Sequence, residues 1–182
     1  HDWIEQAKKF DIVLGFFSTE WWHLQEMREK YYFIETVLGK ATYPSTFHAN
    51  LYEDKKLEAY LAEAMGAPYI KTYVSHDKED ALRLVEGLKY PLVSKIVPAS
   101  GSSGVELVRN VEQARNIVQQ AFSVNGRQTH LNSLRQKNYV YFQDFVPNDG
   151  LDTRIIVIGE WAFGYIRRVL SGDFRASGMK SW

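Results

Sequence analysis

A lysine in an apolar strand, followed by a loop of small residues, is the stretch of this sequence best suited to chemistry. Residues 91–97 (Pro-Leu-Val-Ser-Lys-Ile-Val) are typical of a β-strand in which Lys95 is the only charged residue. Residues 100–104 are Ser-Gly-Ser-Ser-Gly, and 105–108 (Val-Glu-Leu-Val) predict a second strand. Glycines allow close backbone approach, and successive N–H groups and serine hydroxyls bind anionic oxygens. The pattern predicts a hairpin whose loop covers a polyphosphate, with Lys95 neutralising one phosphate.

Two simpler interpretations stand beside this hypothesis. A Gly/Ser-rich turn between strands is often only a hairpin, and a lysine on an edge strand can extend its ammonium group into solvent. The loop also lacks both common nucleotide fingerprints, because no Gly-Lys-Ser/Thr closes it and no three-glycine pattern opens a helix. In favour of a ligand, an unpaired ammonium among apolar neighbours is costly, and a phosphate removes that cost. Motifs elsewhere in the chain are needed to choose between a phosphate-binding loop and a simple hairpin.

Composition excludes several classes of function. The 182 residues include 22 basic and 22 acidic side chains, so no overall field attracts nucleic acid or an anionic membrane. Cysteine is absent, which excludes disulfides and thiolate catalysis, and the five histidines show no metal-ligand spacing. Neither a membrane-spanning run nor a signal peptide is present in this sequence. We expect a soluble cytoplasmic protein without nucleic-acid or membrane partners, and a homo-oligomer remains open.

Hydrophobic periodicity divides the chain into three parts, of α+β class overall. Residues 1–50 are rich in aromatic side chains and predict the tail of a preceding domain, with a linker over 41–50. Residues 51–138 predict a helix opened by Asp54-Lys55, then a strand, a second helix, the hairpin, a third helix from Val111 and a polar loop over 123–138. Residues 139–182 predict antiparallel strands only.

Six motifs occur in a characteristic order: Asp54-Lys55 at a helix start, the strand with Lys95, the small-residue loop, Gln143-Asp144-Phe145-Val146-Pro147, Asp152-x-Arg154 and Gly172-Asp173-Phe174-Arg175. Together they resemble the ATP-grasp superfamily, in particular its branch of glutathione synthases and ligases that add glutamate to a ribosomal protein tail. The resemblance covers about residues 50 to 182. It implies two α+β lobes that hold ATP in the cleft between them. We expect the C-terminal lobe to begin at residue 139 and to be incomplete.

The resemblance also implies roles for individual residues. Lys55 and Lys95 correspond to lysines that contact the nucleotide phosphates, and Asp152 to the residue that binds the ribose hydroxyls. The flap loop, made of Ser100, Gly101, Ser102, Ser103 and Gly104, would cover the β- and γ-phosphates. The hinge, made of Gln143, Asp144, Phe145 and Val146, would bind the adenine edge through main-chain groups. Asp144 departs from the family, which usually has glutamate there.

Enzymes of this kind join a carboxylate to an amine or thiol through an acylphosphate made from ATP, with Mg²⁺. Arg168 and Arg175 are the candidates to stabilise the acylphosphate and the later oxyanion. Their alternative role is pairing with Asp152 and Asp173 on a solvated sheet face. Arg175 is the one carry-over from its segment, since Ala176 and Ser177 depart from the family pattern. The metal ligands of the family lie after this segment, so we expect them beyond residue 182 and expect nucleotide binding with little catalysis here.

Two further functions stay open at this stage. One is a non-catalytic, ATP-binding regulatory module. The other is an interaction domain without a nucleotide, with the aromatic N-terminal segment as its partner surface. The acid and the amine are not defined by the sequence, and a small carboxylate or a peptide remain possible substrates.

Overall fold

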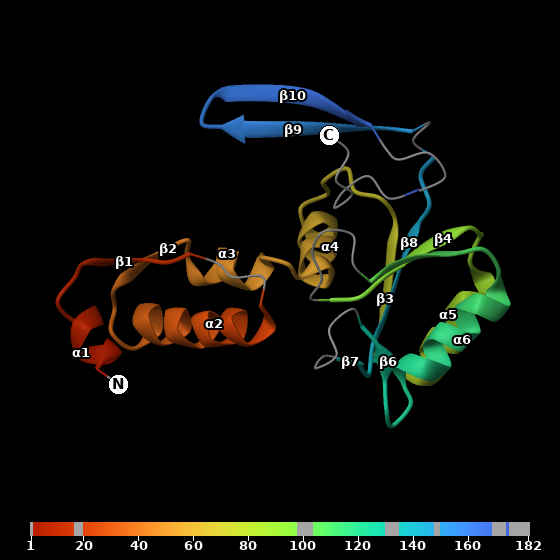
Figure 1. The fold of residues 1–182 in the computed structure, drawn as a ribbon, viewed down its shortest axis with the longest axis horizontal. Helices are drawn as coiled ribbons and strands as arrows, with labels where there is room; N and C mark the ends of the chain where they lie inside the picture. Colours follow the sequence, from red (N-terminus) through yellow and green to blue (C-terminus); the bar gives the residue numbers. More distant parts are fainter. Residues whose placement is uncertain are drawn as a thin grey trace. The chain divides into compact units, whose positions relative to one another are not determined.

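The chain folds into two compact units, His1–Ala67 and Pro68–Trp182, which are described separately (Figure 1). The computed structural model describes residues 2–16, 20–97, 104–129, 135–147, 150–168 and 174. The first unit extends past the boundary that we predict at residue 50, because the helix that begins at Lys55 belongs to it.

The first unit is built around a parallel pair of strands joined through a helix. Its elements are α1 (Trp3–Ala7), β1 (Ile12–Leu14), α2 (Trp21–Thr36), β2 (Ala41–Tyr43), α3 (Thr46–Leu51) and α4 (Lys55–Ala64). β1 and β2 pair in parallel from Ile12↔Ala41 to Leu14↔Tyr43. Among the described side chains of α2, Leu24, Tyr31 and Ile34 are buried. The linker predicted over 41–50 is therefore wrong, since this segment contains β2 and most of α3.

Local capping explains where the helices of the first unit begin. The Ser45 hydroxyl accepts the N–H of His48 and so starts α3. The Asp54 carboxylate accepts the N–H groups of Lys56 (3.0 Å) and Leu57 (3.2 Å), which confirms the predicted helix start at Lys55.

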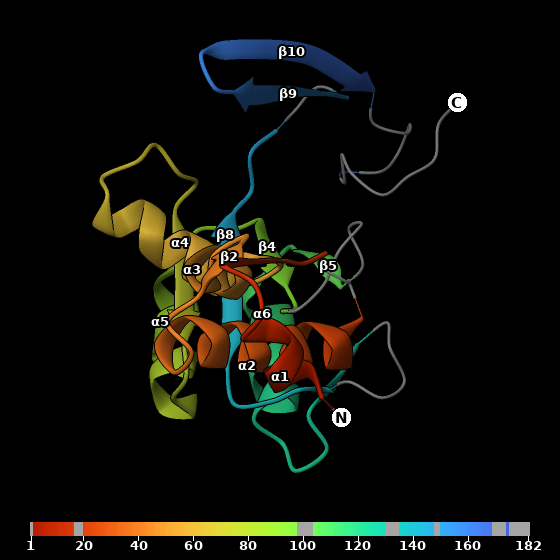
Figure 2. The ribbon, with the colours of Figure 1, turned by 90° about the vertical axis from the view of Figure 1, so that its left-hand side faces the viewer.

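The second unit contains a four-stranded antiparallel sheet with two helices on one face (Figures 1 and 2). In chain order its elements are β3 (Thr72–Ser75), α5 (Lys78–Gly87), β4 (Leu92–Lys95), β5 (Val105–Val108), α6 (Val111–Ala121) and β8 (Val140–Asp144). The strand order is β3-β8-β4-β5. The core between sheet and helices consists of Ala81, Val85, Leu92, Val108, Ala114, Ile117, Val118, Ala121, Val140 and Phe142.

The strand after residue 139 does not open a separate sheet. β8 lies between β3 and β4, so it shares a sheet with Lys95, and a division at residue 139 would cut through that sheet. The predicted loop over 123–138 contains two short paired strands, β6 (Arg127–Gln128) and β7 (Arg135–Gln136). β9 (Leu151–Ile158) and β10 (Trp161–Arg168) form a two-stranded antiparallel hairpin. The two-lobe division of the chain stays a prediction.

Within the described part of the chain, we find no helix with both the length and the apolar character needed to cross a membrane.

The cap of α6 provides a test of the fold. Asn110 accepts the N–H of Gln113 at 3.0 Å, and Gln113 in turn accepts the N–H of Arg109 at 2.7 Å. We expect Asn110→Ala to lower the free energy of unfolding by about 1 kcal/mol, measured by urea denaturation, because an N–H at the helix start loses its acceptor. Asn116→Ala, at an exposed position of the same helix, should change it by less than about 0.5 kcal/mol. Equal losses would show that Asn110 has no capping role.

Candidate functional site

The side chains around Lys95 lie on the sheet face turned away from α5 and α6. β4 and β8 pair in the register Val93↔Gln143, and β3 pairs with β8 in the register Thr72↔Gln143. Residues opposite one another in an antiparallel pair point to the same side, and side chains alternate along each strand. Lys95, Gln143, Tyr141 and Thr72 therefore share one face, whereas Leu92, Val140 and Phe142 face the helices.

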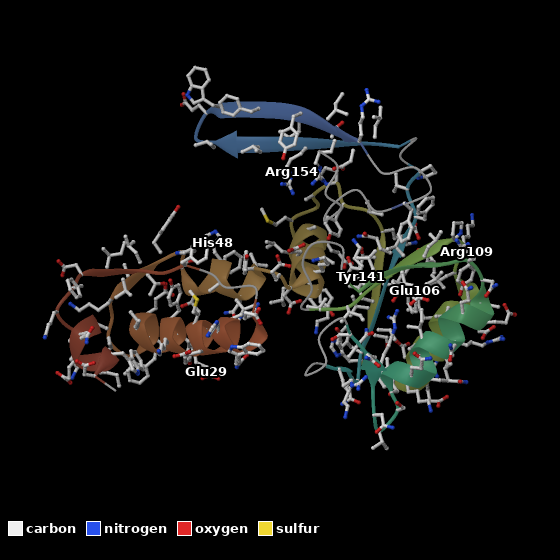
Figure 3. The ribbon with its side chains drawn as sticks, in the orientation of Figure 1. Glu29, His48, Glu106, Arg109, Tyr141 and Arg154 are labelled. Atoms are coloured by element: carbon white, nitrogen blue, oxygen red, sulfur yellow. The ribbon has the colours of Figure 1, made fainter. Side chains whose placement is uncertain are left out.

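Lys95 is held by an ordered group of polar side chains. Its Nζ donates a hydrogen bond to Gln143 Oε1 (2.6 Å) and lies 5.7 Å from the ring centroid of Tyr141, which is labelled in Figure 3. Gln143 Nε2 donates to Thr72 Oγ1 (2.9 Å) and to the Tyr141 hydroxyl (3.2 Å), so the amide oxygen is directed at Lys95. Gln143 is 4% exposed and Tyr141 is fully buried. These groups orient the ammonium.

Asp144 points to the opposite face from Lys95. It pairs with Leu92, a core residue, and lines a cavity of about 510 Å³ with Lys71, Tyr73, Phe145 and residues 87–91. Its N–H donates to the carbonyl of Lys71 at 3.0 Å. The structure therefore brings the Gln143 side chain to Lys95, but it keeps the carboxylate of Asp144 away from the ammonium.

Tyr90 closes part of the same cavity. Its hydroxyl donates to the Val85 carbonyl at 2.7 Å. Burial, together with the charge of Glu86, raises the pKa of Tyr90, which favours the protonated hydroxyl that donates this hydrogen bond.

Lys55 and Lys95 belong to different units of the chain. Lys55 is the first residue of α4 in the first unit, where its Nζ lies 3.7 Å from a carboxylate oxygen of Glu53. Lys95 belongs to the second unit.

Only the last residue of the predicted flap loop is described. Gly104 has φ +70°, and its carbonyl accepts the N–H of Ile96 at 3.1 Å. A Cβ at this position would lie 3.0 Å from the Cβ of Ile96. Both the backbone angle and the close approach require glycine. Ser100, Gly101, Ser102 and Ser103 fall outside the described residues, as does Arg175.

The hairpin of β9 and β10 separates two predicted site residues. Asp152 lies opposite Arg167, whose Nε donates to Oδ2 at 2.6 Å and whose Nη2 donates to the same oxygen. Arg168 lies opposite Leu151 and so points to the other face of the hairpin. Asp152 and Arg168 therefore do not share a face. The carboxylate–arginine pairing that we considered as an alternative is formed between Asp152 and Arg167.

The sequence analysis missed a buried arginine. Arg127 is 8% exposed, and its guanidinium donates to Ser94 Oγ (3.0 Å), Gln136 Oε1 (3.2 Å) and Glu106 Oε2. The segment around it was predicted to be a loop because its polar composition shows no period. The available signal was Glu106, an acidic residue within a strand, together with Arg127 directly after the Asn125-Gly126 turn.

A second cavity lies in the first unit, at the carboxyl end of β2. It has a volume of about 570 Å³ and is lined by Thr42, Tyr43, Pro44, Ser45, His48, Leu51, Tyr52 and Glu58. His48, labelled in Figure 3, has its Nδ1 2.8 Å from the Ser45 hydroxyl. The carboxyl ends of parallel strands commonly border ligand sites.

Comparison with known proteins supports the resemblance. Residues 52–181 match a family described as the RimK-like ATP-grasp domain. Two curated relatives are alpha-aminoadipate–LysW ligases LysX. The Saccharolobus solfataricus protein is 29% identical over 126 residues, and the Sulfurisphaera tokodaii protein is 33% identical over 129 residues. Each match covers 69% of this chain, and it covers 42% and 41% of the relatives, respectively. The chain thus spans about two fifths of their length.

A solved structure confirms the fold. The crystal structure of a RimK domain ATP-grasp protein from Sphaerobacter thermophilus has a TM-score of 0.56 and 18% identity, and the match covers 90% of this chain and 58% of that one. At this identity the likeness concerns the fold alone. It agrees with the predicted α+β ATP-grasp class.

Gly104 allows the hairpin geometry to be tested. We expect Gly104→Ala to destabilise the second unit by about 2 kcal/mol, since the positive φ and the contact with Ile96 both add cost. Gly66→Ala is the control, because Gly66 has φ +62° but open space around it. It should cost about 1 kcal/mol in the first unit. Urea unfolding of both variants measures the difference, and a smaller loss at Gly104 than at Gly66 would contradict the close contact.

Proposed function

Because the chain belongs to the RimK-like ATP-grasp domain family, we propose that it is the ATP-binding part of a ligase that joins a carboxylate to an amine or a thiol. The observation that carries the proposal is the group of Lys95, Gln143, Tyr141 and Thr72 on the face of the sheet opposite α5 and α6. It presents an oriented ammonium at the end of β4, the strand that leads into the flap loop.

In this proposal, Lys95 binds a phosphate of the nucleotide. A charge-assisted hydrogen bond from an ammonium to a phosphate oxygen is stronger than one between neutral groups. The buried amide of Gln143 restricts where the ammonium can go, which lowers the entropy lost on binding. The flap loop, residues 100–104, would add backbone N–H groups over the phosphates, and Lys55 would add a second cation.

The hinge would bind adenine through the main chain after Asp144. The N–H of Asp144 already donates to the Lys71 carbonyl, so the main-chain N–H that donates to adenine would be that of Phe145 or Val146. Asp152 would bind the ribose hydroxyls. Both described bonds from Arg167 end on Oδ2, which leaves Oδ1 to accept a hydroxyl.

The proposed reaction proceeds through an acylphosphate. An oxygen of the substrate carboxylate attacks the γ-phosphorus, and ADP leaves. The amine or thiol then attacks the acyl carbon, phosphate leaves, and the nucleophile loses its proton. For these steps the protein must position the reactants and supply positive charge. We assign the positive charge to Arg168 and Arg175.

Magnesium is expected from the family but does not fit the residues that the structure describes. Among them we find no group of three or more His, Asp or Glu side chains able to hold a metal ion. The steps above are therefore assigned to side chains alone.

The acid and the amine are also part of the proposal rather than of the findings. The relatives are named as ligases of alpha-aminoadipate and LysW. A small carboxylate or a peptide is the corresponding substrate class here.

Removing the Lys95 charge tests the proposal directly. We expect Lys95→Met to weaken ATP binding roughly 10- to 100-fold, which corresponds to the loss of about 1.5–3 kcal/mol from a charged hydrogen bond. Isothermal titration calorimetry measures this. Lys78→Met is the matched control, since it removes the same charge from an exposed lysine at the start of α5. A wild-type chain that does not bind ATP would refute the proposed function, and unchanged affinity in Lys95→Met would remove Lys95 from the site.

Adding a carboxylate beside Lys95 tests the same charge in another way. Gln143→Glu would place a carboxylate at hydrogen-bonding distance from the ammonium. This carboxylate would pair with the ammonium and repel a phosphate. We expect ATP affinity to fall at least about tenfold, with little change in stability. Gln119→Glu, on the exposed side of α6, adds the same charge elsewhere and should have almost no effect. Similar affinities for the two variants would contradict the role of the Lys95–Gln143 pair.

A further inference from the structure

We propose that Arg127 is a positioning residue that holds the base of the β4–β5 hairpin and thereby sets the affinity of the site for the phosphates of the nucleotide. The inference rests on the proposed function, because its test measures the affinity for ATP. It concerns a residue on β6, outside every motif that the sequence analysis identified.

The guanidinium of Arg127 connects three strands. Nη1 donates to Ser94 Oγ on β4 (3.0 Å) and to Gln136 Oε1 on β7 (3.2 Å), and Nη2 donates to Glu106 Oε2 on β5. Ser94 is fully buried and Gln136 is 1% exposed. Glu106, labelled in Figure 3, is the half-exposed member of the group.

Two of these partners lie directly beside the proposed phosphate site. Ser94 is paired with Glu106 in the sheet, and the next pair is Lys95 with Val105. One guanidinium therefore ties the two hairpin strands together, one residue before the pair that contains Lys95. Beyond that pair, the N–H of Ile96 bonds to the carbonyl of Gly104, where the flap loop ends.

The same network reaches the point where the chain leaves β4. Gln136 Nε2 donates to the carbonyl of Tyr139 at 3.2 Å. The Tyr139 hydroxyl donates to the carbonyl of Val97 (2.8 Å) and accepts the N–H of Val97 (2.7 Å). The side chains of Arg127, Gln136 and Tyr139 thus hold the strand on both sides of Lys95.

Arg127 does not contact a nucleotide bound on the face of the sheet that carries Lys95. Ser94 and Glu106 point to the helix side of the sheet, whereas Lys95 points to the other side. Its influence passes through the register and twist of the hairpin. A buried ion pair is weak evidence for stability alone, and such groups are retained in some proteins because they specify one geometry. Specifying the position of the flap strands is the role that the contacts support.

The experiment compares ligands with and without phosphates. Dissociation constants of the chain for ATP and for adenosine are measured by NMR titration, together with thermal unfolding. We expect Arg127→Met to weaken ATP binding at least fivefold while adenosine binding stays within twofold, and Arg127→Lys to restore part of the loss. Arg115→Met is the matched control. It removes the arginine of an exposed pair, in which Arg115 Nε and Nη2 each donate to Glu86 at 2.6 Å, and it should change neither constant.

Equal changes for ATP and adenosine, or no change in a folded variant, would overturn the positioning role. If Arg127→Met does not fold, Glu106→Gln carries the test, since it keeps the contacts of Arg127 with Ser94 and Gln136. We expect it to lower the preference for ATP over adenosine about threefold, and an unchanged preference would refute the inference. If the wild-type chain binds no ATP, the proposed function fails. The effect of Arg127 on the stability of the β4–β5 hairpin is then measured separately, by amide hydrogen exchange at 92–95 and 105–108. The exchange must be faster in Glu106→Gln than in Arg115→Met.

Discussion

The candidate site depends on the insertion of β8 between β3 and β4. Gln143 and Lys95 are 48 positions apart in the chain, and only the antiparallel pairing of their strands brings them into contact. The register is set on the other side of the sheet, where Leu92, Val140 and Phe142 are buried against α5 and α6. A shift by one residue would expose this core and would turn Asp144, instead of Gln143, toward the ammonium. The packing of the face that carries α5 and α6 therefore determines the chemistry of the opposite face.

Two neighbouring positions on β4 link this chemistry to the stability of the hairpin. Ser94 points toward α5 and α6 and accepts a hydrogen bond from the buried Arg127, whereas Lys95 points to the opposite face. The alternation of side chains along a strand separates a structural cation from a candidate ligand-binding cation by a single residue. The hairpin can be held rigidly from one side without blocking the other.

Much of the fold could be predicted from local sequence, and the failures share one cause. The helices that begin at Lys55, Lys78 and Val111 have clear periodicity and capping residues, and the structure contains them. The strand Ala41–Tyr43 and the paired strands at Arg127 and Arg135 were missed, because segments of two or three residues are too short to show a period. Their existence depends on pairing partners elsewhere in the chain.

By itself, the sequence determined the α+β class, the order of the motifs, and the chemical character of the Lys95 strand and the glycine that ends the flap loop, because these depend on residue types and local spacing. Only the tertiary structure decided which side chains meet. It placed Gln143 beside Lys95, turned Asp144 to the opposite face, paired Asp152 with Arg167 and buried Arg127 against Ser94 and Glu106. The alternation of side chains along a strand assigns them to two faces of a sheet. Which face is covered, and by which partner, depends on long-range packing that a local sequence pattern does not predict.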